Sequence, residues 1–292
     1  MSTYALFTGC TIRMMLPHLE AASRKVLSRL DIALVDLPFT CCPTTVLREV
    51  DDTAWLTMAA RNLAVAEQEG LDILALCNGC TQSLKEAQHL LEDPQRRRAV
   101  NGKLAEIGME YRGTATVNHF AAVLYDMREE LPPLVTGRLA GVRVASQPGC
   151  HILRPSEIMA FDDPERPSKY DELIEAIGAT PVDYPNKTLC CGFNLFEVDR
   201  SAAARIVMDK IEAMSKAGAD LVTTGCPSCF TQFDRNQLIA RRIDGRDVSM
   251  PVLFFPQLVG LALGFSADEM GLGHHRVKVE VAALADMTVA SV

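Results

Sequence analysis

Hydrophobic and polar positions follow one another along the chain in a pattern typical of strands and helices that alternate. Apolar residues at helical spacing predict an amphipathic helix at residues 53–69, which stops at Gly70. The same spacing predicts a helix at residues 201–217, which stops at Gly218. Glycine suits both ends, because it adopts the left-handed backbone that closes many helices without strain.

Short apolar runs follow both helices and predict β-strands at residues 71–76 and 220–224. Two further strands are predicted at residues 4–7 and 142–147, and each leads through a glycine to a cysteine. Strands that alternate with helices predict parallel α/β layers, in which ligands usually bind at the carboxyl ends of the strands. We therefore expect the cysteines to lie in loops at those ends.

The pattern of elements occurs twice, which indicates a duplicated unit. Residues 35–38, Val-Asp-Leu-Pro, match residues 182–185, Val-Asp-Tyr-Pro, in the second copy. We expect repeats at residues 1–140 and 141–292, joined near residues 131–141. The predicted fold class is α/β, with two pseudo-symmetric cysteine-rich halves that each contain a small parallel sheet flanked by helices.

Composition adds limits on class and partners. Hydrophobic residues make up 48% of the 292 residues and charged residues 23%, the usual mixture of a globular protein. The net charge of −8 opposes binding to a polyanion, so nucleic acid is not an expected partner.

Residues 250–265 form the longest apolar run, but prolines interrupt it and it is too short to span a bilayer. We expect either a buried segment or a contact with another subunit. The first residues lack the features of a secretory signal, which favours a cytoplasmic protein.

Ten cysteines carry the chemical signal, because a reducing compartment favours metal or redox roles for them over structural disulfides. They form two matching sets of five, each a single cysteine, an adjacent pair and a C-x-x-C. Their positions are Cys10, Cys41, Cys42, Cys77, Cys80, Cys150, Cys190, Cys191, Cys226 and Cys229. In both sets 35 positions separate the second cysteine of the pair from the C-x-x-C.

Five thiolates are one more than a tetrahedral zinc ion or a common four-thiolate iron–sulfur cluster takes. A larger or more open iron–sulfur cluster would use the fifth. Structural zinc with one idle cysteine per half is an alternative, and a thioredoxin-like dithiol is a weaker one because it needs only the C-x-x-C.

The doubled cysteine pattern, with the turns Cys77-Asn-Gly-Cys80 and Cys226-Pro-Ser-Cys229, resembles the doubled CCG domain of the B-type subunit of heterodisulfide reductase. The resemblance extends over nearly the whole chain. It includes residues 51–62, 149–156, 161–167 and 258–265.

This resemblance implies that the five cysteines of each half hold one noncubane [4Fe-4S] cluster, giving two clusters that flank a disulfide or thiol substrate. It implies an oxidoreductase acting on sulfur groups, whose partners are a ferredoxin-like C-type subunit, together with a flavoprotein A-type subunit. A sulfur-oxidising variant is included in this expectation. The alternative is an electron-relay iron–sulfur subunit of an organic-acid or quinone oxidoreductase, without disulfide chemistry.

The sequence departs from the methanogen type after Cys190-Cys191-Gly192, where Phe193, Leu195 and Phe196 replace a glycine-rich run. Bulky side chains would fill the space that glycines leave for a ligand. We therefore expect a different pocket and a substrate other than coenzyme M–coenzyme B heterodisulfide.

Three residues outside the cysteines are candidates for the site. His151 directly follows Cys150 and could donate a proton to a departing thiolate, or be a loop histidine bound to backbone. Arg13 and Arg154 lie three and four residues after the opening cysteines and could bind an anionic substrate group, although solvated arginines are more common.

Overall fold

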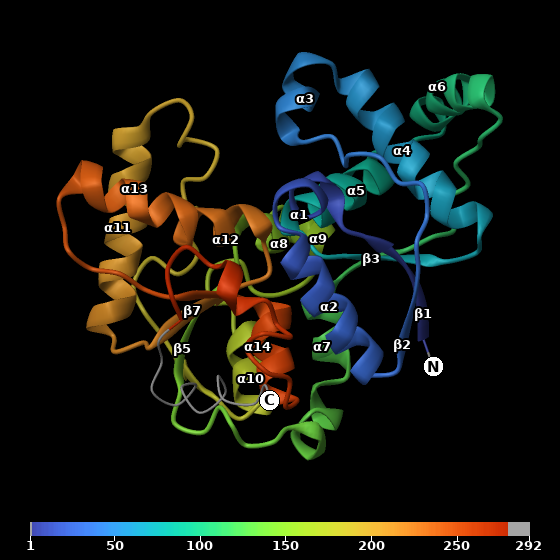
Figure 1. The fold of residues 1–292 in the computed structure, drawn as a ribbon. Helices are drawn as coiled ribbons and strands as arrows, with labels where there is room; N and C mark the ends of the chain where they lie inside the picture. The colour runs from blue at the N-terminus through green and yellow to red at the C-terminus, as the bar shows by residue number, and fades with distance from the viewer. Residues whose placement is uncertain (1, 280–292) are drawn as a thin grey trace.

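Two four-stranded parallel sheets, each flanked by helices, make up the molecule in a computed structural model that describes residues 2–279 (Figure 1). The first sheet has the strand order β2-β1-β3-β4. Its strands are β1 (Ser2–Phe7), β2 (Ile32–Val35), β3 (Asp72–Ala75) and β4 (Val117–His119).

The second sheet repeats this topology in the order β6-β5-β7-β8. Its strands are β5 (Arg143–Gln147), β6 (Thr180–Val182), β7 (Leu221–Thr224) and β8 (Val252–Phe254). Every strand pair in both sheets is parallel, so all four carboxyl ends lie at one edge of each sheet. The predicted pseudo-symmetric α/β fold is confirmed. All strands β1–β4 precede residue 141 and all strands β5–β8 follow it, while the domain boundary itself stays a prediction.

The helices of the first half connect its strands and continue beyond them. They are α1 (Gly9–Met15), α2 (Pro17–Arg29), α3 (Thr45–Val50), α4 (Asp52–Gln68), α5 (Asn78–Leu90), α6 (Pro94–Leu104) and α7 (Phe120–Asp126). Helix α4 is the predicted helix, shifted by one residue, and Gly70 has the expected positive φ of 64°.

The second half contains α8 (Cys150–Leu153), α9 (Ser156–Met159), α10 (Lys169–Ala176), α11 (Arg200–Lys216), α12 (Pro227–Phe233), α13 (Arg235–Asp244) and α14 (Phe255–Ala262). Helix α11 is the counterpart of α4, and both have 17 residues. Gly218 closes α11 at a φ of 81°, so the helix end repeats as well.

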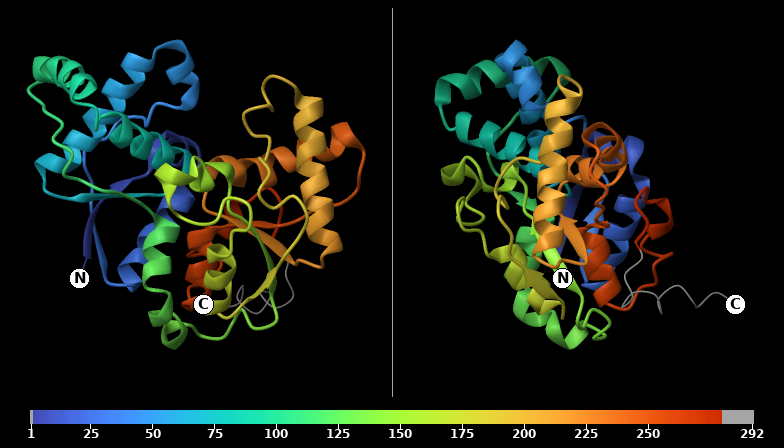
Figure 2. Two further views of the ribbon diagram at one scale, coloured as in Figure 1. Left: turned by 180° about the vertical axis from the view of Figure 1, so that it is seen from behind. Right: turned by 90° about the vertical axis from the view of Figure 1, so that its left-hand side faces the viewer.

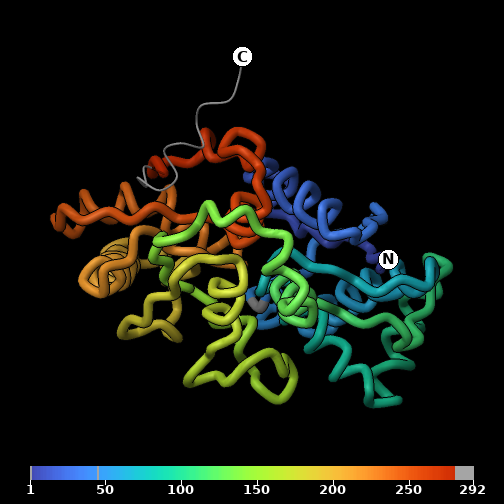
Figure 3. The backbone as a smooth tube through the Cα atoms, turned by 90° about the horizontal axis from the view of Figure 1, so that it is seen from below, coloured from blue at the N-terminus to red at the C-terminus, as the bar shows by residue number. Residues whose placement is uncertain are grey.

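The two halves pack along two contacts. Helix α14 of the second half lies on α2 of the first, and the views from behind and from below show the red segment beside the blue helix (Figures 2 and 3). Helix α5 of the first half packs on α8 and α9.

The apolar run at residues 250–265 forms β8 and α14, and all eight residues of α14 are buried within the chain. The buried interpretation of this run is confirmed. Its proposed contact with another subunit is wrong, because helix α2 already covers it. Within residues 2–279, none of the helices has both the length and the hydropathy of a membrane span.

Candidate functional site

The cysteines lie at the carboxyl ends of the strands, as the α/β pattern predicts, but only six of them lie outside helices. These are Cys41 and Cys42 after β2, Cys190 and Cys191 after β6, and Cys77 and Cys226, which directly precede α5 and α12. The other four, Cys10, Cys80, Cys150 and Cys229, lie in the first turns of helices, which corrects the expectation of loops. Only one or two residues separate these strands from the helices that follow, so the connections are too short to hold all of the sulfurs.

All ten cysteines are free thiols, and their side chains form a continuous series of contacts. Within the first set the Sγ atoms of Cys10 and Cys41 are 3.8 Å apart. Within the second set those of Cys191 and Cys229 are 3.3 Å apart. The order of contacts is 10, 41, 42, 80, 77 in the first set and 150, 190, 191, 229, 226 in the second.

The two series meet where the thiols of Cys77 and Cys226 contact each other. Both side chains are buried. The same five-thiol arrangement therefore approaches this junction from both sides, as pseudo-symmetry requires. No three His, Cys, Asp or Glu side chains among residues 2–279 converge as the ligands of a single metal ion do.

Hydrogen bonds along the series favour thiolates at particular positions. Hydrogen bonds from Cys150 and then Cys191 lower the pKa of Cys190 to about 2, and the backbone N–H of Gly192 adds to the effect from 3.4 Å. In the first set, hydrogen bonds from Cys41 and Cys80 lower the pKa of Cys42. Thiolates are the form that binds metal, so the arrangement suits metal–sulfur ligation.

Two glycines provide the space that the sulfurs need. A β-carbon at Gly9 would lie 2.8 Å from Sγ of Cys80, and one at Gly149 would lie 2.5 Å from Nδ2 of Asn78. Both glycines have positive φ, 68° and 86°, which side chains rarely tolerate. Glycine before the opening cysteine is therefore required by close packing within the first half at Gly9 and by the close approach of the two halves at Gly149.

A single cavity of about 150 Å³ opens onto both sets of cysteines, and every cysteine except Cys41 lines it. Phe193 and Asn194 line it too, as expected for a bulky residue after Gly192. Leu195 and Phe196 do not, which corrects that part of the prediction, because the turn after Phe193 directs them elsewhere and Phe196 is buried.

His151 also lines this cavity, between the two sets. A β-carbon at Gly79 of the first half would lie 3.4 Å from its Nδ1 atom. Its charge contributes to the lowered pKa of both Cys42 and Cys190. The predicted histidine is therefore near both sulfur sites, and its role in proton transfer stays a proposal.

Helix α5 ties the two halves together at the site. Asn78, which follows Cys77, donates a hydrogen bond from Nδ2 to the carbonyl oxygen of Pro148 at 2.6 Å. Gln82, one turn further on, donates to the carbonyl oxygen of Arg154 at 3.1 Å. The C-x-x-C of the first half is thus held directly against the strand and helix that carry Cys150.

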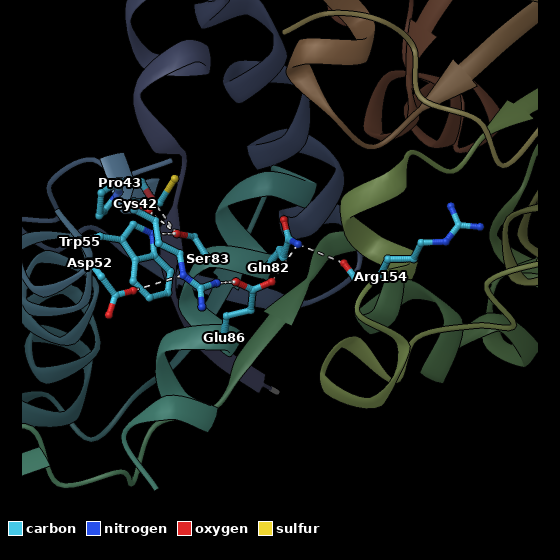
Figure 4. Close-up of polar contacts among 9 residues, drawn as sticks. Cys42, Pro43, Asp52, Trp55, Gln82, Ser83, Glu86 and Arg154 are labelled. Carbon is cyan, nitrogen blue, oxygen red and sulfur yellow. Dashed lines mark hydrogen bonds and ion pairs between the residues drawn. The ribbon is translucent and has the colours of Figure 1, made fainter. Parts of the chain in front are cut away.

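A buried network holds the Cys42 loop against α5 (Figure 4). Trp55, the only tryptophan of the chain, donates from Nε1 to Oγ of Ser83 at 3.0 Å. The Ser83 hydroxyl contacts the carbonyl oxygens of Cys42 at 2.6 Å and Pro43 at 2.7 Å. Arg48 covers the Trp55 ring, with its guanidinium carbon 4.8 Å from the ring centroid. The spacing of residues in the sequence does not predict this network beside Cys42.

The two candidate arginines lie outside the shared cavity. The Arg154 guanidinium bonds to the carbonyl oxygens of Pro164 at 2.8 Å and Thr188 at 3.3 Å and to Glu165. Figure 4 shows this side chain directed away from Gln82. Arg13 lines a different cavity of about 430 Å³ beside Cys10 and Cys41. Substrate binding by either arginine stays a prediction, and the contacts of Arg154 favour a structural role.

Sequence reasoning missed a group of buried polar residues behind the second set. His119, at the end of β4, contacts the carbonyl oxygen of Gly225 at 3.1 Å, directly before Cys226. A β-carbon at Gly225 would lie 2.1 Å from the Tyr170 hydroxyl. Lys210 on α11 is buried as well and donates at 2.9 Å to Gln147, which lies three residues before Cys150. These residues come from separate elements and are far apart in the sequence. No local spacing pattern therefore shows that they lie together.

The fold and the site define a doubled cysteine-rich protein with two converging sets of five thiols. The model of the CCG cysteine-rich domain family matches residues 4–85 and 144–234, one match in each half. Within that class the chain belongs to the family of B-type subunits of heterodisulfide reductase. Membership of this family implies iron–sulfur binding in an oxidoreductase complex.

Two relatives and one solved structure illustrate the range of similar proteins. The chain is 40% identical, over 95% of each chain, to the B-type subunit of the Ferredoxin/F(420)H(2)-dependent CoB-CoM heterodisulfide reductase of Methanosarcina acetivorans. It is 34% identical to the 8-methylmenaquinol:fumarate reductase membrane anchor subunit of Wolinella succinogenes, over 93% of this chain and 96% of that protein. A hypothetical protein from Helicobacter pylori shares the fold alone, with a TM-score of 0.79 at 20% identity over 96% of this chain and 52% of that one.

Proposed function

We propose that this protein reduces, or in the reverse direction forms, a small-molecule disulfide between two iron–sulfur clusters. The observation that carries the proposal is the single cavity onto which cysteines of both sets open. A disulfide accepts two electrons and two protons and yields two thiols, R–S–S–R′ + 2e⁻ + 2H⁺ → RSH + R′SH. Iron–sulfur clusters pass electrons one at a time, so two clusters, one held by each set of cysteines, would supply the pair.

Each half provides the ligands for one noncubane [4Fe-4S] cluster in this proposal. The first cluster is held by Cys10, Cys41, Cys42, Cys77 and Cys80, and the second by Cys150, Cys190, Cys191, Cys226 and Cys229. The contacts between the sulfurs of each set support this assignment, as does the space left by Gly9 and Gly149. Zinc at each half is the competing assignment.

His151 would act on protons in the cavity. It lies beside thiols of both sets, and a histidine donates or accepts protons near neutral pH. Phe193 would exclude water and shape the second side of the cavity. In this scheme His151 donates a proton to a departing thiolate while the cysteines hold the metal.

Reducing equivalents must come from other proteins, because the sequence has no G-x-G-x-x-G fingerprint for a flavin or nicotinamide after a strand. We propose as these partners a ferredoxin-like C-type subunit, together with a flavoprotein A-type subunit. The relatives named for ferredoxin-dependent reductases support this choice. We place the complex in the cytoplasm, whose reducing conditions suit ten free thiols.

A second function is an electron relay without disulfide chemistry. It is favoured by the 34% identity to a subunit of an 8-methylmenaquinol:fumarate reductase, whose name includes no disulfide substrate. The two functions differ in what the cavity binds, so thiol binding at the clusters distinguishes them.

Metal content of anaerobically purified protein is the first test. Two four-iron clusters require about eight iron atoms per chain. Elemental analysis together with electron paramagnetic resonance measures both the amount and the type of cluster. About two zinc atoms with almost no iron would refute the proposal in favour of a zinc-stabilised module.

Paired cysteine variants test the ligand sets. We expect Cys41→Ala to empty only the first site and Cys190→Ala only the second, so each folded variant retains about half of the iron. Loss of both clusters from either single variant, in protein that is still folded, would show that the halves share ligands.

Reconstitution with a ferredoxin-type partner tests the reaction. We expect electrons to pass from a low-potential donor to an organic disulfide, and thiol products to change the spectrum of an oxidised cluster. Spectra that ignore every thiol tried, while electrons still reach a quinone or flavin, would favour the relay. Coenzyme M–coenzyme B disulfide should turn over poorly because of Phe193, and rapid turnover would show that this residue leaves the pocket open.

A further inference from the structure

The polar surroundings of the two sulfur sites differ at positions that the duplication makes equivalent. Lys210 is the eleventh residue of α11, and Asn62 is the eleventh residue of the matching 17-residue helix α4. Both side chains are buried, with 2% and 0% of their surface exposed. One half therefore carries an ammonium where the other carries a neutral amide.

The neighbours of Lys210 differ in the same way. Gln147 ends the central strand β5, whereas apolar Phe7 ends the central strand β1. Lys210 donates from Nζ to Oε1 of Gln147 at 2.9 Å, and Tyr184 donates to the same oxygen at 3.1 Å. At this strand end the second half thus has hydrogen-bonding side chains where the first half has the apolar ring of Phe7.

The hydrogen-bond acceptors around the ammonium of Lys210 are neutral. Besides Gln147 they are the backbone oxygens of Asn186 and, at 3.5 Å, Lys187, and no ion pair among residues 2–279 includes Lys210. A buried charge without an opposite charge is costly, by several kcal/mol even after relaxation. Some anion close by must therefore offset it.

The second set of thiols lies within electrostatic range of Lys210, and it becomes anionic when its members bind metal as thiolates. Burial lowers the pKa of Lys210 to about 8, and Cys229, Cys191, Cys190 and Cys150 oppose that shift through their charges. The three oxygen acceptors around Nζ match the three N–H groups of an ammonium. Asn62 cannot play this part, because its own side chain is a neutral amide, which accepts from Thr40 at 2.8 Å and donates to the Cys41 carbonyl at 3.1 Å. The Arg61 guanidinium is 3.5 Å from Oδ1 of Asn62 and donates to the carbonyl oxygen of Pro38 in an exposed contact.

We propose that Lys210 is the buried counter-charge of the second cluster and makes that cluster the better electron acceptor of the two. The inference rests on the proposed iron–sulfur clusters. Reduction adds one negative charge to a cluster, and a fixed cation in a low-dielectric interior stabilises the reduced form. At Asn62 the first half has only the half-buried Arg61 beside a neutral amide and no buried cation, so the duplicated fold holds two unequal sites.

Redox titration of the iron-loaded full chain, followed by electron paramagnetic resonance, tests the proposal. The Cys41→Ala change empties the first site, so that the second is titrated alone. In this background Lys210→Met removes charge and hydrogen bonds, while Lys210→Gln removes the charge and keeps an amide donor. At the parent midpoint we expect both variants to lower the ratio of reduced to oxidised cluster at least tenfold, about 59 mV for one electron.

Two controls separate charge from structure. Lys216→Met removes the same charge from the same helix, but at an exposed site paired with Glu212, and should leave the ratio within twofold. Lys210→Arg keeps the charge and should restore the ratio to within threefold. If the midpoint is unchanged in iron-loaded Lys210→Met and Lys210→Gln, the role of Lys210 is refuted while the proposed function stands. The same holds if Lys210→Met shifts the midpoint and Lys210→Gln does not. A parent chain without iron would instead overturn the proposed function, and this inference with it.

Discussion

The hydroxyl of Ser83 offers a sharp test of how the first half supports Cys42. Ser83 is buried, with 3% of its surface exposed, and Trp55 is fully buried. The Ser83→Ala change leaves the Trp55 Nε1–H without its acceptor, and it removes the proton shared by the carbonyl oxygens of Cys42 and Pro43. Each buried polar group left unpaired costs about 1–3 kcal/mol. One donor and one carbonyl together predict a loss of about 2–6 kcal/mol in the free energy of unfolding.

Urea unfolding followed by far-ultraviolet circular dichroism measures this loss, because the signal does not depend on Trp55. Trp55→Phe removes the donor of the same hydrogen bond, so it should be non-additive with Ser83→Ala. The double variant should be less destabilised than the sum of the single variants by about 1 kcal/mol. The iron content of the first site should fall in Ser83→Ala, since the Cys42 loop loses its anchor.

Thr57→Ala is the matched control, because its hydroxyl bonds at 2.8 Å to the Thr53 carbonyl on the exposed side of α4. We expect it to change stability by about 0.5 kcal/mol or less. A Ser83→Ala variant as stable as this control would refute the argument. So would strict additivity with Trp55→Phe.

Three further predictions concern the junction between the halves and the cavity. Gly149→Ala should reduce iron binding, because its β-carbon would lie 2.5 Å from Nδ2 of Asn78 at a positive φ, and elemental analysis of the folded variant measures this. Burial lowers the pKa of His119 to about 4, below its unfolded value of about 6.5, so the unfolded chain binds more protons between these values. Stability should therefore fall as pH drops from about 6.5 to 4, and His119→Gln should flatten that slope in urea titrations; an unchanged slope would contradict the assignment. Phe193→Gly should raise turnover of coenzyme M–coenzyme B disulfide by reconstituted protein, and unaltered turnover would show that Phe193 does not limit the cavity.

The elements of this fold were predictable from the sequence because they depend on neighbouring residues. Helical spacing and a closing glycine located α4 and α11 to within a residue, and the two helices end alike at Gly70 and Gly218. Cysteines at equal spacing in both halves placed the sulfurs at strand ends. Each of these signals extends over one turn or one strand, and each occurs in both halves because the unit is duplicated.

The local sequence pattern predicted less well the exact start of a helix and which element covers an apolar segment. The start of α5 directly after β3 placed Cys80 in a helix instead of a loop. The apolar run at residues 250–265 could not show that α2 covers it, because α2 lies more than 200 positions earlier in the sequence.

Tertiary structure alone decided how the two halves meet. Cys77 and Cys226 are 149 positions apart, and their contact depends on the packing of α5 against the second half. The difference between Asn62 and Lys210 is visible in the sequence, but its meaning depends on burial and on the thiols beside the lysine. Charge has a large effect only where the fold removes water, so the sequence specified two equal sets of ligands and the interior made their surroundings unequal.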